Sequence, residues 1–211
     1  MGDHVALLGD SIFDNSAYTG AEPDVIAHLR SLLPPDWRAS LFAVDGSTIS
    51  DLAAQLRLVS AEVTHLVISV GGNDALLNSD LLGRRVSSTT EALTLFRERV
   101  TRFESAYRAA IDAALALARE TTTCTIYNGN FDDEQALLVR VALMLFNDVI
   151  LRIAFERGLR IIDLRLICTE PADYANPIEP SGHGGRKISE AIARTLGVLD
   201  GKMGQSRVYA G

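Results

Sequence analysis

The chain has 211 residues, 47% of them hydrophobic and 22% charged, which is typical of one soluble globular domain. A formal charge of −7 argues against a nucleic-acid partner, because such binding depends on clustered Lys and Arg. No apolar run approaches the roughly 20 residues of a membrane span, and an apolar segment starting at Val5 leaves no room for a signal peptide. We therefore expect a cytoplasmic protein, in which Cys124 and Cys168 are reduced or buried thiols.

The first predicted strand is the apolar run Val5–Leu8, which leads into Gly9-Asp10-Ser11. This order places the hydroxyl of Ser11 at the carboxyl edge of a sheet, where open α/β sheets bind their ligands. Gly, Asp and Ser are also common turn residues, so the motif alone is equally typical of a plain turn.

Two further predicted strands end in the same kind of residues. The strand over residues 37–44 is followed by Gly46, and the strand over residues 64–70 is followed by Asn73. Because parallel strands end at one edge of a sheet, we expect Ser11, Gly46 and Asn73 to converge there.

Helical patterns alternate with these strands and with two later strands at residues 123–127 and 160–164. The predicted helices cover residues 23–33, 48–56, 88–114, 133–158 and 181–196. Leu93 and Leu137 belong to stripes that are expected to face the core. Residues 75–88 have no clear period and are expected to border the substrate. The alternation predicts an α/β domain over residues 1–200, with a parallel sheet covered on both faces, and a tail over residues 201–211.

The three strand ends together resemble the SGNH or GDSL hydrolase superfamily. Its first block is Gly-Asp-Ser, its second supplies a Gly, and its third is Gly-x-Asn-Asp; Ser11, Gly46 and Asn73 match these positions in order. The resemblance covers roughly residues 4 to 198. It implies a three-layer αβα, flavodoxin-like fold whose five parallel strands have the order 2-1-3-4-5.

The resemblance also implies a carboxylic-ester hydrolase that needs no metal or cofactor. Ser11 would attack a small acyl or acetyl ester and form an acyl-enzyme. The backbone N–H groups of Ser11 and Gly46 and the amide of Asn73 would form the oxyanion hole, in which one lost donor typically costs about 100- to 1,000-fold in rate.

The last block of the family departs from its usual pattern here. That block is Asp-x-x-His-Pro, with a Gly five residues after the His. Pro180 and Gly184 set the register, which puts Asn176 at the Asp position and Glu179 at the His position. The usual acid and base are therefore absent from their expected positions.

Three hypotheses for the base remain open. His183 could serve, one helical turn after Glu179, with Asp173 or Glu179 orienting its ring. Glu179 could itself be the base, which requires a raised pKa. The third possibility is a binding module without a base. A flavodoxin-like receiver or nucleotide-binding domain is less favoured, because Arg165 is the only cation near the last strand and no Gly-x-Gly-x-x-Gly follows a strand.

Overall fold

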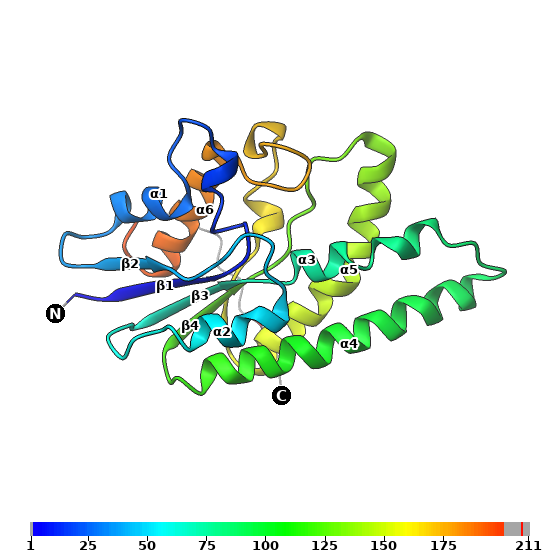
Figure 1. Ribbon diagram of the computed structural model, residues 1–211, viewed down its shortest axis with the longest axis horizontal. Coiled ribbons are helices and arrows are strands. Elements are labelled where there is room, and N and C mark those ends of the chain that lie inside the picture. Colours follow the sequence, from blue (N-terminus) through cyan, green and yellow to red (C-terminus); the bar gives the residue numbers. More distant parts are fainter. Residues whose placement is uncertain (1, 201–207, 209–211) are drawn as a thin grey trace.

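Five parallel strands form one sheet in the computed structural model, which describes residues 2–200 and residue 208 (Figure 1). Their order, β2-β1-β3-β4-β5, is the predicted one. The strands are β1 (His4–Gly9), β2 (Arg38–Leu41), β3 (His65–Ser69), β4 (Glu120–Cys124) and β5 (Arg160–Ile162). The tail predicted over residues 201–211 lies, apart from residue 208, outside the described residues.

Helices cover both faces of the sheet, as the alternating pattern predicted (Figure 1). They are α1 (Val25–Leu32), α2 (Leu52–Leu56), α3 (Gly72–Leu76), α4 (Thr89–Leu115), α5 (Asp133–Glu156) and α6 (Gly182–Thr195). Their starts follow ordinary capping chemistry, because the side chains of Ser88 and Ser181 accept hydrogen bonds from the first turns of α4 and α6. Within residues 2–200 and 208, no helix is both long enough and apolar enough to cross a membrane.

The core is two apolar layers, one on each face of the sheet. Alternate residues of β1 point to opposite faces, so Val5 and Leu7 pack with α1 and α6, while Ala6 and Leu8 pack with α2, α4 and α5. All six residues of β1 are buried, as expected for a strand covered on both sides. This rigid central strand delivers the Ser11 motif to the sheet edge.

The fourth strand begins three residues earlier than predicted. Strand β4 contains Thr121, Thr122 and Thr123, which are buried in the sheet, whereas the sequence suggested residues 123–127. Threonine is β-branched and favours strands, and a buried hydroxyl is tolerated when it is hydrogen bonded. Thr123 meets this condition, since its Oγ1 lies 2.5 Å from the Tyr107 hydroxyl.

The predicted inward positions of Leu93 and Leu137 are wrong. Their side chains are 60% and 68% exposed. The buried residues of α4 begin at Phe103, and those of α5 begin at Phe146. The first turns of both helices project past the carboxyl edge of the sheet, where no strand lies beneath them (Figure 1).

Asn147 on α5 is a buried polar anchor for the segment after β4. Its Oδ1 accepts the N–H of Ile126, and its Nδ2 donates to the carbonyl of Ile126, both at 2.8 Å. We expect Asn147→Leu to lower the free energy of unfolding by about 2 kcal/mol, because both backbone groups lose their partner. Urea denaturation measures this change. Asp148→Ala, at the exposed neighbouring position, is the matched control, and equal losses in the two variants would contradict the anchor role.

Candidate active site

The Ser11 loop begins at the carboxyl end of β1, next to β3. Gly9 has φ +129°, and a Cβ there would lie 1.7 Å from the carbonyl oxygen of Ser69, so only glycine fits. The N–H of Asp10 then donates to the Ser69 carbonyl at 3.1 Å. The Ser11 side chain that follows is 6% exposed and lines a cavity at the carboxyl edge.

The other two strand ends contact this loop and each other. The N–H of Val44 donates to the Gly9 carbonyl at 3.1 Å, which ties the segment that carries Gly46 to β1. The Asn73 amide donates to the carbonyl of Ser47 at 2.9 Å. Gly46 has φ +78°, a left-handed conformation that glycine adopts without strain. The structure therefore links the three segments, and Ser11 and Asn73 line the cavity, whereas Gly46 is not one of its lining residues.

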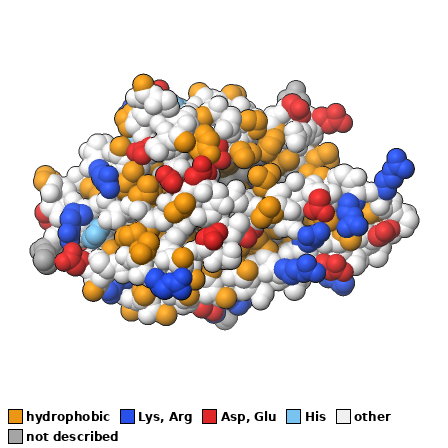
Figure 2. Space-filling view, in the orientation of Figure 1, with side chains coloured by type: hydrophobic (Ala, Val, Ile, Leu, Met, Phe, Trp, Pro, Cys, Tyr) orange, Lys and Arg blue, Asp and Glu red, His pale blue; other side chains and the backbone are white. Residues whose placement is uncertain are grey.

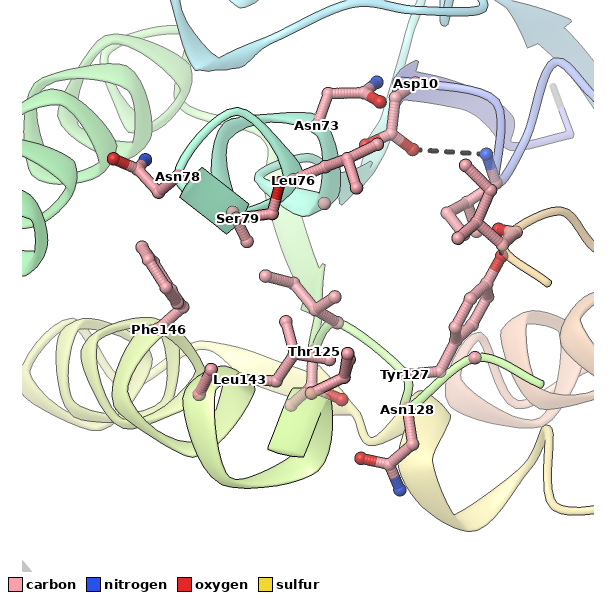
Figure 3. Close-up of a pocket in the computed structure, with 18 of the residues that line it drawn as sticks. Asp10, Asn73, Leu76, Asn78, Ser79, Thr125, Tyr127, Asn128, Leu143 and Phe146 are labelled. Atoms are coloured by element: carbon pink, nitrogen blue, oxygen red, sulfur yellow. Dashed lines mark hydrogen bonds between the residues drawn. The ribbon is translucent and has the colours of Figure 1, made fainter. Parts of the chain in front are cut away.

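The cavity has a volume of about 220 Å³. Asp10, Asn73 and Glu179 line it together with Ser11, and Figure 3 shows further polar side chains, Asn78 and Asn128, at other points around it. Asp10 and Asn73 lie on one side, while Leu143 and Phe146 of α5 lie across from them. The remaining apolar walls come from β3, α3, α4, α5 and the segment after β4, through Val70, Ala75, Leu76, Phe96, Ile126, Phe131 and Val139. A ligand with one polar group and an apolar tail fits this distribution.

Glu179 lies in the same cavity wall, with only 7% of its surface exposed. Burial raises the pKa of its carboxyl, and the Ser11 side chain, close enough to favour the charged form, partly offsets the rise. Oε2 of Glu179 is buried and has no hydrogen-bond partner among the described residues. Such a carboxylate has an oxygen free to take a proton.

His183 lies elsewhere. Its side chain is 54% exposed and does not line the cavity, and its Nε2 lies 3.6 Å from Oδ1 of Asp173. Glu179 precedes Ser181, the N-cap of α6, so the helical i,i+4 relation predicted between Glu179 and His183 does not apply. The predicted contact of His183 with Asp173 is present, but neither residue lines the cavity.

One group of residues offers enough ligand atoms for a metal ion. Glu170, Asp173 and His183 place three such atoms within 4.8 Å of one another. The Asp173 carboxylate, however, already binds the ammonium of Lys187 at 2.7 and 2.9 Å and accepts the N–H of Thr169 at 2.8 Å. The lysine supplies the positive charge that a metal would bring, so the donor set is better explained as a buried ion pair.

Two residues that hold the Ser11 loop in place were not predicted from the sequence. Gln55 of α2 accepts the Gly9 N–H at 2.7 Å and donates to the Gly9 carbonyl at 2.8 Å, which fixes the end of β1. Asn15 accepts the Val25 N–H at 3.0 Å and donates to the Pro180 carbonyl at 3.2 Å, which ties the Ser11 loop to the residue after Glu179. The position of Gln55, a polar residue among the inward-facing leucines of its helix, could have indicated its role. No pattern in the sequence indicated the role of Asn15.

Asp10 is a buried carboxyl beside Ser11 with an altered proton affinity. Its side chain is 3% exposed. Burial raises its pKa to about 7 against the opposing hydrogen bond from the Ile12 N–H, and the nearby carboxylates of Glu179 and Asp74 add to the rise. In the folded protein Asp10 therefore stays protonated up to about pH 7, whereas in the unfolded chain it ionises near its ordinary value of 3.8.

Asp10 should make the folded state less stable as pH rises. Between pH 3.8 and about 7 the folded state binds the extra proton, so stability falls across that window and levels off above it. The resulting loss of folding stability is about 4 kcal/mol at most, at 1.36 kcal/mol per pKa unit.

We expect Asp10→Asn to gain stability relative to the wild type as pH rises from 4.5 to 8. Urea denaturation at both values measures this gain, with the exposed Asp36→Asn as control. Parallel pH profiles of Asp10→Asn and the wild type would contradict the assignment.

The sequence was compared with known families. Residues 7–186 match the family model of the GDSL-like lipase/acylhydrolase family, which is most of the chain. The chain belongs to this family. Among curated proteins, no sequence is significantly similar to this chain.

Solved structures share the GDSL fold with this chain at low sequence identity. The extracellular lipase of Streptomyces rimosus is 16% identical, with a TM-score of 0.68 over 92% of this chain and 99% of the other. The enzyme LAE5 from the Lake Arreo metagenome is 20% identical, with a TM-score of 0.70 over 95% and 97%. A catalytic mutant of Axe2, an acetylxylan esterase from Geobacillus stearothermophilus, is 19% identical, with a TM-score of 0.68 over 96% and 99%. These likenesses show the GDSL fold; the family match supports hydrolase chemistry.

Proposed function

We propose that this GDSL-family protein is an esterase in which Ser11 is the nucleophile and Glu179 the general base, acting on small acyl esters. The observation that carries the proposal is the shared cavity: Ser11 lines it beside Glu179, whose buried Oε2 has no hydrogen-bond partner among the described residues, and most of the other walls are apolar. No metal ion or cofactor takes part in the proposed reaction.

The proposed reaction begins with proton transfer from the Ser11 hydroxyl to the Glu179 carboxylate. The raised pKa of Glu179 makes it a stronger base than an exposed carboxylate. Ser11 Oγ attacks the ester carbonyl, and the resulting oxyanion accepts hydrogen bonds from the N–H groups of Ser11 and Gly46 and from the second N–H of the Asn73 amide. The alcohol leaves with the proton from Glu179, and water then releases the acyl group by the reverse sequence.

The proposed substrate has an acyl chain of modest length. At about 220 Å³ the cavity is smaller than the roughly 300–1,000 Å³ that is usual for ligand pockets, which favours a short acyl chain. The alcohol side would face the open end near Asn78, Ser79 and Gln135, which line the mouth. We place the reaction in the cytoplasm, because Cys124 and Cys168 are both free thiols, as is usual in a reducing compartment.

Hydrolysis of p-nitrophenyl acetate, butyrate and octanoate, by the wild type beside Ser11→Ala, tests this proposal. Equal rates of ester hydrolysis by Ser11→Ala and the wild type would overturn the proposal. The competing function is a binding module, favoured by Glu179 at the family's histidine position; catalytic mutants of Axe2, by contrast, replace a serine in one structure and a histidine in another. That module would bind a fatty acid in the cavity but would leave every ester intact.

A further inference from the structure

Exposed leucines flank the mouth of the cavity on two sides. The first set lies on α3 and the turn η3 (Ser79–Gly83) that follows it. The second lies on the first turns of α5. The two sets, called the leucine lips below, are Leu76, Leu77 and Leu82, exposed by 46%, 72% and 42%, and Leu137, Leu138 and Val141, exposed by 68%, 57% and 63%.

The first turns of α5 carry apolar residues both on the side that lines the cavity and on the side exposed to solvent. Val139, Ala142 and Leu143 line the cavity, while Leu137 and Leu138 point to solvent. A helix with one covered side normally carries polar residues on the other. This part of α5 stands away from the sheet in Figure 1, and in Figure 2 hydrophobic side chains gather around the hollow beside it. The outer side is therefore an apolar surface that an ordinary solvated helix would not have.

The lips are continuous with the cavity. Leu76 and Leu82 belong to both, because each lines the cavity and is also more than two-fifths exposed. Ile178, next to Glu179, does the same with 36% exposed. An apolar path thus runs from the molecular surface to the neighbourhood of Ser11. A contiguous exposed apolar patch that leads into a pocket marks a binding surface.

Charge decides what kind of surface fits the lips. Arg84 and Arg85 follow η3, whereas Asp132 is the N-cap of α5 and Glu134 lies in its first turn, so charges of both signs adjoin the two lips in the chain. The chain as a whole carries −7. An anionic surface would be repelled overall, while an uncharged or zwitterionic one would not.

We propose that the leucine lips dock on the surface of aggregated, uncharged or zwitterionic acyl lipids. An acyl chain would then slide from the aggregate into the cavity along Leu76 and Leu82 without crossing water. The choice of acyl lipids rests on the proposed function, but the docking itself needs no catalysis.

Vesicle sedimentation tests the docking apart from the chemistry. All variants carry Ser11→Ala, so that no ester is consumed, and the probe is a vesicle of phosphatidylcholine alone. The double variant Leu77→Ser/Leu138→Ser should partition about tenfold more weakly for each leucine removed, from the transfer free energy of a leucine side chain. Leu58→Ser is the matched control, because Leu58 is 67% exposed but lies outside the lips, and it should partition like the parent.

Equal partitioning of the double variant and its parent would overturn the proposal, and so would tighter binding to vesicles rich in phosphatidylserine than to phosphatidylcholine. Light scattering tests the alternative that a second copy of the chain covers the lips. A parent protein that is dimeric, beside a double variant that is monomeric, would show this and overturn the proposal. Equal ester hydrolysis by the wild type and Ser11→Ala would overturn the proposed function but not the docking. Docking is measured without turnover, so its failure leaves the proposed function standing.

Discussion

Ser11→Ala is expected to abolish ester hydrolysis, with kcat lower by at least about 1,000-fold. The reason is that Ser11 lines the cavity beside the buried carboxyl of Glu179, which can take the proton of its hydroxyl. Removing the nucleophile of a serine hydrolase costs about 10⁶-fold in a well-studied case, and the oxyanion donors alone retain a small residual rate. Initial rates on p-nitrophenyl butyrate measure the loss.

Ser79→Ala provides the matched control for Ser11→Ala. Ser79 also lines the cavity but lies near the mouth on η3, so its removal should leave kcat close to that of the wild type. Labelling with an organophosphonate adds a covalent readout, because only an activated serine reacts. Labelling of the Ser11→Ala variant would assign the nucleophile to another residue.

Glu179→Gln is expected to lower kcat by about 100- to 10,000-fold, the usual contribution of a general base. Glutamine keeps the size of the side chain but cannot accept the proton from Ser11. His183→Ala should leave kcat nearly unchanged, because that ring is half exposed and outside the cavity wall. The reverse order of the two variants would make His183 the base, and equal wild-type rates for both would remove each of them from the mechanism.

The pH profile gives an independent test of the base. Glu179 accepts a proton only when ionised, and burial raises its pKa, so activity should increase as pH rises through that raised value and then level off. This limb should persist in His183→Ala. A limb that disappears in His183→Ala would instead make His183 the base. Asp10, with a pKa of about 7, titrates nearby, so Asp10→Asn should be measured beside them.

Much of the fold could be predicted because its signals are local. Apolar runs that end in Gly, Asp, Ser and Asn marked the carboxyl ends of β1 and β3, and the N-caps Ser88 and Ser181 marked the starts of α4 and α6. The second strand was predicted over residues 37–44 but ends three residues earlier, at Leu41. The three-threonine strand β4 was placed late because threonine looks polar in a sequence, although its burial in the sheet depends on partners such as Tyr107. The order of the strands came from the family resemblance.

The sequence by itself determined which segments lie at the sheet edge, since Ser11, Gly46 and Asn73 each lie within five residues of the end of a strand. Only the tertiary structure decided what surrounds them. Glu179 and His183 are four residues apart, and the sequence left both open as the base while favouring His183. Glu179, in the turn before Ser181, lines the cavity, whereas the half-exposed His183 contacts the buried Asp173 and does not line it. The exposure of Leu137 likewise depends on α5 projecting past the sheet, because helical spacing states which residues share a face but not whether anything packs against it.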